Sequence, residues 1–208
     1  MRPGRYFLWW LHRSTVGTDV VKQDRARRTH ELLLDSAAAE FVRHGFAGTN
    51  LSDVVARARL TKGALYGHFA SKAELAEELT RWFEEAWRTV LASVGNSLRE
   101  LTVGLARRID DDVRFAAGLR LATDAARTDR REPAPLGELR ARLHALVVDA
   151  QREGRIDAGH RPEVLVRFVV ALVMGMHSTR WSTRQEGSDN EVLEVWDLVL
   201  GAVAAPGS

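Results

Sequence analysis

The sequence predicts an all-α protein with an N-terminal three-helix helix-turn-helix domain and a larger C-terminal helical domain. Apolar residues recur at helical spacing through most of the chain. Between Thr49 and Lys72, two short helical patterns flank a tight turn. Residues 1–72 hold 12 Lys and Arg against 6 Asp and Glu, whereas residues 73–208 hold 18 against 22. The basic part of the chain therefore coincides with the helix-turn-helix pattern, which favours DNA as its partner.

Composition excludes several other classes of protein. The 208 residues contain no cysteine, so neither a disulfide framework nor a thiolate zinc site is possible, and a reducing cytoplasm is compatible. No stretch approaches 18 uninterrupted apolar residues, so the sequence predicts no membrane-spanning helix and no membrane partner. The run FLWWL at 7–11 is too short for a secretory signal.

Residues 1–21 do not fit a folded head domain, since they combine Pro3, Gly4 and Gly17 with an aromatic cluster that has no helical period. Three interpretations remain open. The segment could be translated upstream of the true start, form an arm or short helix on DNA or on the body, or anchor to a membrane surface. We expect it to be disordered or packed on its own protein, because exposed aromatic clusters are a liability.

The first helix is predicted from Asp24 to His44, with a stripe of apolar residues on one side and Gly45 as its stop. The stripe comprises Leu33, Leu34, Ala37, Ala38 and Phe41. Arg25, Arg27 and Arg28 lie near its start. They either contact phosphate or the minor groove, or they form a solvated helix end.

The helix-turn-helix begins with Thr49 or Asn50 as a cap, and its second helix begins at Thr61. The side chains expected to face inward are Leu51, Val54, Val55, Leu65 and Phe69. The second helix keeps Lys62, Gly63, Tyr66 and Gly67 outward, which gives a small, flat, basic face suited to a major groove.

The remaining chain is predicted to be helical, with a loop at 124–135 and a loose tail after Ala204. A long helix starts after its cap at Ser71. The predicted helices are 72–94, 97–109, 113–123, 136–153, 161–185 and 190–203. The last two carry more apolar surface than one body can cover, since Leu193 and Leu198 lie off the main stripe.

No catalytic or metal-binding pattern emerges, and no cofactor is expected. The seven histidines form no HExxH pair, and no GxSxG, P-loop or dinucleotide fingerprint is present. Asp110, Asp111 and Asp112 are consecutive, so they cannot converge on one ion, and we interpret them as a helix cap. His177 and Trp181 share a helical face; they could line a cavity or pack in the interior.

The residues of the head that follow a known family pattern are Ala37, Phe41, Gly45, Phe46, Thr49, Val54, Ala56, Ala58, Thr61, Lys62, Gly63, Leu65, Tyr66, His68, Phe69, Lys72, Glu74 and Leu75. With these residues, the chain from Arg25 to about Leu79 resembles TetR-type transcriptional regulators, and its run TKGALYGHF is similar to the γ-butyrolactone autoregulator-receptor branch. The segment AGLRLAT at 117–123 resembles the same branch.

Three residues depart from the family pattern. Arg59 replaces the turn glycine at a position that often needs positive φ, which costs about 1 kcal/mol or changes the turn. Gly67 replaces an aromatic residue and removes a groove or phosphate contact. Leu139 aligns with the tryptophan that receptors of this branch place in the pocket. This chain could therefore be a divergent receptor, or a pseudo-receptor that answers to antibiotics or their intermediates.

The resemblance implies a homodimeric repressor that leaves a pseudopalindromic operator when a small hydrophobic molecule binds. The domains are then 1–21 (extension), 22–72 (DNA binding), 73–204 (ligand binding, with dimerisation through the last two helices) and 205–208 (tail). The residues expected at double-stranded operator DNA are Arg25, Arg28, Thr49, Ser52, Thr61, Lys62, Gly63, Ala64, Tyr66, Gly67, His68 and Lys72. The expected ligand-binding residues are Trp82, Trp87, Leu119, Thr123, Leu139, Leu143, Leu172, Met174, Met176, His177 and Trp181.

Two other functions stay open. One is a drug or metabolite sensor that controls efflux or degradation genes. The other is a helical scaffold or interaction protein that has kept the fold but no longer recognises a specific DNA sequence. The departures at Arg59 and Gly67 are the observation that motivates this alternative.

Overall fold

The computed structural model describes residues 7–93, 97–130, 132–183 and 189–204; of these, 7–19, 129, 176–183 and 189–192 are described by backbone alone. Within these ranges the chain is helical, apart from an isolated β-bridge between Ile156 and Ala204. None of the described helices is long and apolar enough to span a membrane. The helices are α1 (Phe7–Gly48), α2 (Leu51–Ala58), α3 (Lys62–Tyr66), α4 (Lys72–Ser93), α5 (Leu98–Asp111), α6 (Val113–Asp129), α7 (Ala134–Arg152), α8 (Pro162–Thr183) and α9 (Asp189–Val203).

The head consists of α1–α3 and the start of α4, packed around one apolar core. The predicted stripe of α1 is buried, as are Val54, Val55, Leu65 and Phe69, while Leu51 is partly buried. Glu40, a buried carboxylate on α1, accepts a 2.6 Å hydrogen bond from Nε of Arg57 on α2. The predicted head core is therefore confirmed.

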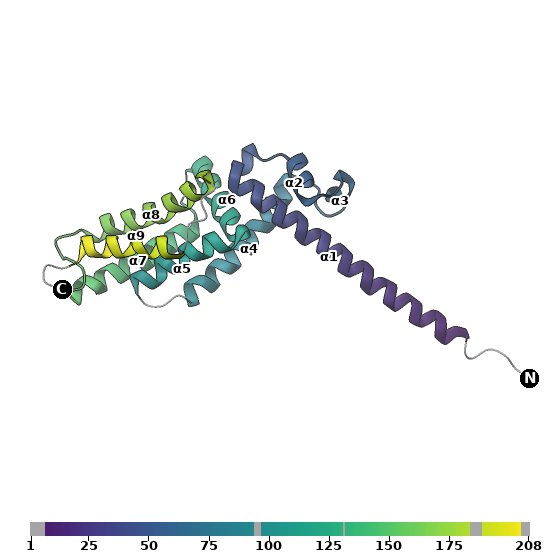
Figure 1. Ribbon diagram of the computed structural model, residues 1–208, viewed down its shortest axis with the longest axis horizontal. Helices are drawn as coiled ribbons and strands as arrows, with labels where there is room; N and C mark the ends of the chain where they lie inside the picture. The colour runs from purple at the N-terminus through teal and green to yellow at the C-terminus, as the bar shows by residue number, and fades with distance from the viewer. Residues whose placement is uncertain (1–6, 94–96, 131, 184–188, 205–208) are drawn as a thin grey trace, which may run out of the picture.

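Helix α1 starts much earlier than predicted, at Phe7 instead of Asp24. Its N-terminal half projects away from the rest of the molecule as one long helix (Figure 1). Starting a helix is costly, but extending an existing one is not, and the packed half of α1 provides the start. No proline or glycine lies between Gly17 and His44 to stop the helix from extending toward the N-terminus. The predicted stop is confirmed, since Gly45 has φ 65° and interrupts the helical geometry. The side chains of the aromatic cluster at 6–10 lie outside the described residues, so the expectation that they are disordered or packed on the protein itself stays a prediction.

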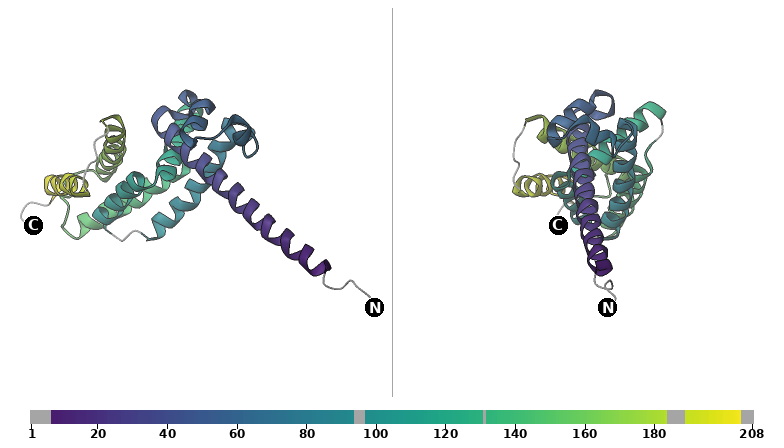
Figure 2. Two further views of the ribbon diagram at one scale, coloured as in Figure 1. Left: turned by 45° about the vertical axis from the view of Figure 1, so that its right-hand side comes forward. Right: turned by 90° about the vertical axis from the view of Figure 1, so that its right-hand side faces the viewer.

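The body is built in layers, with α8 and α9 on the outside and α5 and α7 between them and α4 (Figure 2). Ser71 caps α4, because its Oγ accepts from the amide of Glu74 at 3.2 Å. Asp112 caps α6, because its carboxylate accepts from the amides of Arg114 and Phe115 at 3.0 and 3.1 Å. These two predicted caps are confirmed. The tail at 205–208 lies outside the described residues.

Helix α6 connects the head to the body, since it packs against both α1 and α4. A Cβ placed on Gly118 would lie 2.2 Å from Cβ of Phe83, so the backbone of α6 lies directly on α4. The predicted end of this helix at Thr123 was wrong, because α6 continues to Asp129 and the expected loop starts later. The polar residues 124–129 were interpreted as loop, but helices accept polar residues on an exposed face.

Candidate nucleic-acid interface

Two local caps fix the helix-turn-helix. The side chain of Asn50 accepts from the amide of Ser52 at 3.0 Å, and Oγ1 of Thr61 accepts from the amide of Ala64 at 3.2 Å. Because Leu65 is buried, the opposite face of α3 must point outward, and Tyr66 is 58% exposed. Both helices therefore start where the sequence predicts.

A groove of about 560 Å³ lies beside α3 and collects residues from four helices, α1 to α4, and from the loop before α2. Five of the expected DNA-contacting residues line it: Thr49, Ser52, Lys62, Tyr66 and Lys72. Its lining includes two lysines, Lys62 and Lys72, together with polar side chains such as Ser52 and Asn50. This arrangement suits a phosphate backbone passing alongside the recognition helix.

Thr49 and Lys72 also hold the head together. The Thr49 side chain is buried, and its hydroxyl donates to the carbonyl of Gly45 at 2.8 Å. The ammonium of Lys72 donates to the carbonyls of Phe46 and Thr49 at 2.7 and 2.9 Å, and lies 4.6 Å from the ring centroid of Phe46. A lysine ammonium has three donors, so one remains for a phosphate.

His68, at the end of α3, is partly buried, and its ring meets His30 of α1 edge-on at 5.8 Å. Nε2 of His30 lies 2.7 Å from a carboxylate oxygen of Glu78 on α4. One side of the His68 ring is therefore covered by its own protein, and a smaller part of the side chain is accessible to DNA than expected. The side chains of Arg25 and Arg28 on α1 are exposed, and neither lines the groove.

The two departures within the motif have opposite structural consequences. Arg59 adopts the left-handed conformation, with φ 53° and ψ 40°, so the turn keeps its shape and arginine bears the strain. Gly67 has φ −72°, and a Cβ there would lie 3.5 Å from the nearest carbonyl oxygens, an ordinary contact. The structure therefore does not require glycine at position 67.

The expected ligand-binding residues lie on α4, α6, α7 and α8. Trp87, Leu139 and Leu143 are 1% exposed and Leu119 is 3% exposed, while Trp82, Thr123, Leu172 and Met174 are partly buried. Trp87 donates its indole N–H to Glu138 at 3.1 Å and stacks on Phe115 with centroids 6.1 Å apart. The side chains of Met176, His177 and Trp181 lie outside the described residues. The described members of the set form part of the core.

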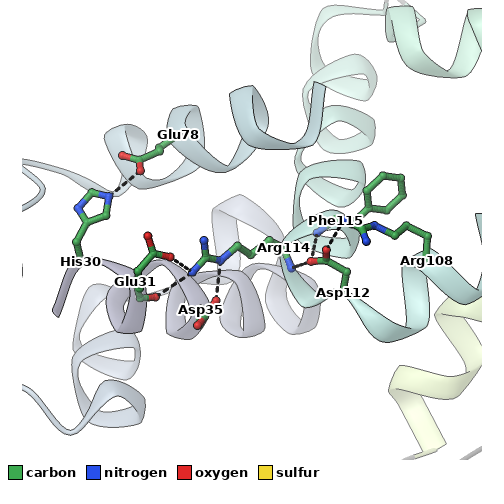
Figure 3. Close-up of polar contacts among 8 residues, drawn as sticks. All are labelled: His30, Glu31, Asp35, Glu78, Arg108, Asp112, Arg114 and Phe115. Atoms are coloured by element: carbon green, nitrogen blue, oxygen red, sulfur yellow. Dashed lines mark hydrogen bonds and ion pairs between the residues drawn. The ribbon is translucent and has the colours of Figure 1, made fainter. Parts of the chain in front are cut away.

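An arginine on α6 ties the body to the head (Figure 3). Nε of Arg114 donates to Asp35 at 2.6 Å, and its Nη2 donates to the carboxylate and the carbonyl of Glu31. Burial lowers the pKa of Arg114, but the hydrogen bonds and charges of Asp35 and Glu31 outweigh it and raise the pKa above its ordinary value. Arg114 stays charged at any pH at which the protein folds.

This contact between head and body was not predicted from the sequence. Glu31 and Asp35 are one turn apart on α1, so two acids share one face and favour a basic partner. That pattern could have indicated an ion pair. Only the crossing of α1 and α6 identifies Arg114 as the residue that makes it.

Comparisons with known proteins agree with this arrangement. Residues 33–79 match the family described as bacterial regulatory proteins, tetR family. The chain is 28% identical over 193 residues to the A-factor receptor protein of Streptomyces griseus, covering 90% of this chain and 68% of that protein. It is 31% identical to CprB from Streptomyces coelicolor, solved with its operator sequence, covering 88% and 92% of the two chains with a TM-score of 0.68. A γ-butyrolactone receptor described as ArpA-like is 29% identical, with 88% and 90% covered and a TM-score of 0.69.

The fold and the groove beside α3 define a two-domain, helical, DNA-binding regulator of transcription. The chain belongs to the TetR family. Its relatives are regulators and not enzymes.

Proposed function

We propose that this protein represses transcription by holding α3 of each of two chains in the major groove of a pseudopalindromic operator. The observation that carries the proposal is the groove beside α3, which gathers Ser52, Lys62, Tyr66 and Lys72 at one surface. Lysines beside an exposed aromatic side chain supply phosphate contacts together with a contact to a base or sugar. Such a protein acts on chromosomal DNA and therefore works in the cytoplasm.

The two chains pair through α8 and α9, which leave large apolar side chains uncovered in the single chain. Val164 and Phe168 on α8 are 56% and 48% exposed, and Leu198 on α9 is 75% exposed. Burying these side chains against a second copy removes apolar surface from water. A two-fold dimer also presents two recognition helices to two half-sites.

The effector we propose is a small hydrophobic molecule of the γ-butyrolactone type, bound in the body among the residues expected from the sequence. The A-factor receptor and the ArpA-like γ-butyrolactone receptor support this ligand class. Thr123 and His177 are the polar members of that set, and most of the others are apolar. A ligand there lowers operator affinity to the extent that it prefers the conformation with a different head spacing.

Leu139 favours a second candidate class of effector. It is a buried aliphatic residue at the position that aligns with the pocket tryptophan of the branch, so the stacking partner for a lactone is absent. Antibiotics or their biosynthetic intermediates, or other drugs and metabolites, are then the ligands to test.

Fluorescence anisotropy tests release directly, with full-length protein, a labelled operator duplex and γ-decalactone as the probe. The expected result is an operator Kd that rises about tenfold or more, equivalent to about 1.4 kcal/mol. An unchanged Kd with lactones and a raised Kd with antibiotics would select the second class. An unchanged Kd with both would remove the effector from the proposal.

A further inference from the structure

We propose that the junction of the head and the body is a second small-molecule site, which takes an uncharged molecule with an alkyl chain and one polar end. A cavity of about 1070 Å³ lies there, between the end of α1, the first half of α4 and the second half of α6. These three helices meet where the head joins the body (Figure 1). The site is separate from the core residues to which we assign the effector.

Backbone geometry holds one edge of this junction cavity in place. Gly45 turns the end of α1 with φ 65°, and a Cβ there would lie 2.6 Å from a carboxylate oxygen of Asp124 on α6. Nε of Arg120 donates to both oxygens of that carboxylate, at 3.1 and 3.2 Å. The corner of the head therefore rests on a fixed acid–base pair of the body.

The walls combine apolar surface with polar and charged side chains. Phe46, Leu121 and four alanines contribute the apolar part: Ala47, Ala73, Ala76 and Ala125. The alanines leave the space that larger side chains would fill. A pocket of this size that combines apolar surface with hydrogen-bonding side chains is typical of small-molecule sites.

The charges around the cavity nearly balance, which argues against an ionic ligand. Glu74, Glu77 and Asp124 oppose Arg81 and Arg120 among its lining residues. Glu74 is already engaged, since its carboxylate accepts from the amide of Ala70 at 2.6 Å. Arg120 bonds Asp124 through Nε, so its Nη groups can donate to an ester or carbonyl oxygen of a ligand.

The location of the cavity between the head and the body connects ligand binding to DNA binding. Its walls belong partly to the head and partly to α6, so a bound molecule touches both parts at once. Any change in the angle between them would break some of those contacts, and the ligand therefore favours the angle seen here. Operator affinity changes by the differential binding of the ligand to the two angles.

Photoaffinity labelling of the full-length protein locates the ligand directly. The probe is a γ-butyrolactone whose alkyl chain carries a diazirine, and γ-decalactone is the competitor. Mass spectrometry is expected to find competitor-sensitive label on segments 73–81 and 124–128, which hold lining residues of the junction cavity and none of the residues assigned to the effector. Label confined to α5, α7 and α8 would overturn the junction site and leave the proposed effector site intact. The absence of competitor-sensitive label anywhere would also overturn it.

A matched set of variants provides the second readout. Ala73→Trp and Ala125→Trp fill the cavity from opposite walls, and each is expected to reduce junction labelling about tenfold. Ala92→Trp, an exposed alanine on α4 outside the cavity, is the control and should label as the wild type does. Circular dichroism verifies that the variants fold, and the two walls supply independent tests. Equal labelling of all four proteins would contradict the site.

Discussion

The head and the body use their side chains in opposite ways. In the head, the residues assigned to DNA include exposed ones such as Lys62 and Tyr66, held on α3, which Thr61 caps. In the body, the residues assigned to the ligand include Trp87 and Leu143, which are also core residues. Binding and stability should therefore separate in the head and remain linked in the body, and the following predictions test that difference.

The largest effect is expected from Gly118→Ala in the body. The new Cβ would meet Phe83 at 2.2 Å, so α4 and α6 must move apart, at a cost of about 2–3 kcal/mol in the free energy of unfolding. Chemical denaturation measures the loss. Gly137→Ala on α7 is the control, because the nearest atom to its Cβ is 3.7 Å away and the variant should be as stable as the wild type or more stable. Equal stability of both variants would show that α6 does not lie so close to α4.

Tyr66→Ala should affect binding without affecting stability. Removal of this 58% exposed ring is expected to raise the operator Kd about tenfold or more, while the thermal unfolding midpoint stays unchanged. Anisotropy and differential scanning calorimetry measure the two quantities. A lower unfolding midpoint would mean that the tyrosine stabilises the head, and an unchanged Kd would remove it from the interface.

Arg114→Ala should have an intermediate effect, because it lies on the connection between the two regions. The guanidinium side chain is 17% exposed, but Glu31 and Asp35 are about half exposed, so solvent screens the pair. The expected loss in the free energy of unfolding is about 1 kcal/mol. Arg140→Ala breaks the exposed ion pair with Glu132 and serves as the control, with a loss below about 0.5 kcal/mol. Equal losses in the two variants would mean that the contact between head and body stabilises the fold no more than an exposed ion pair does.

Gly67→Phe should give the smallest change, and in the favourable direction. A side chain fits at this position without strain, so an aromatic ring would restore a groove or phosphate contact. We expect operator affinity to rise about threefold, equivalent to about 0.6 kcal/mol. Gly67→Ala is the control for helix propensity alone. If alanine raises affinity as much as phenylalanine, the gain comes from the helix end and not from a new contact.

The sequence predicted the head better than the body because head geometry follows from local signals. The cap at Thr61, the positive φ at Gly45 and the inward pair Leu65 and Phe69 depend on residues a few positions apart. Arg59 shows the limit of such signals, because the tertiary fold holds arginine in a conformation that favours glycine.

Contacts between distant helices could not be predicted in the same way. Nothing local to Arg114 identifies Glu31 and Asp35 as its partners, and nothing local to Ala125 indicates a cavity with Ala73 on the opposite wall. The early start of α1 at Phe7 and the late end of α6 at Asp129 were missed because helices propagate through weakly patterned sequence once a packed segment exists.

DNase footprinting with the full-length protein on duplexes from its own gene neighbourhood tests the central claim most directly. At low salt we expect protection of a pseudopalindrome whose half-sites lie about one helical turn or more apart, and loss of this protection with Tyr66→Ala. A wild-type protein that protects no duplex at low salt would contradict the account.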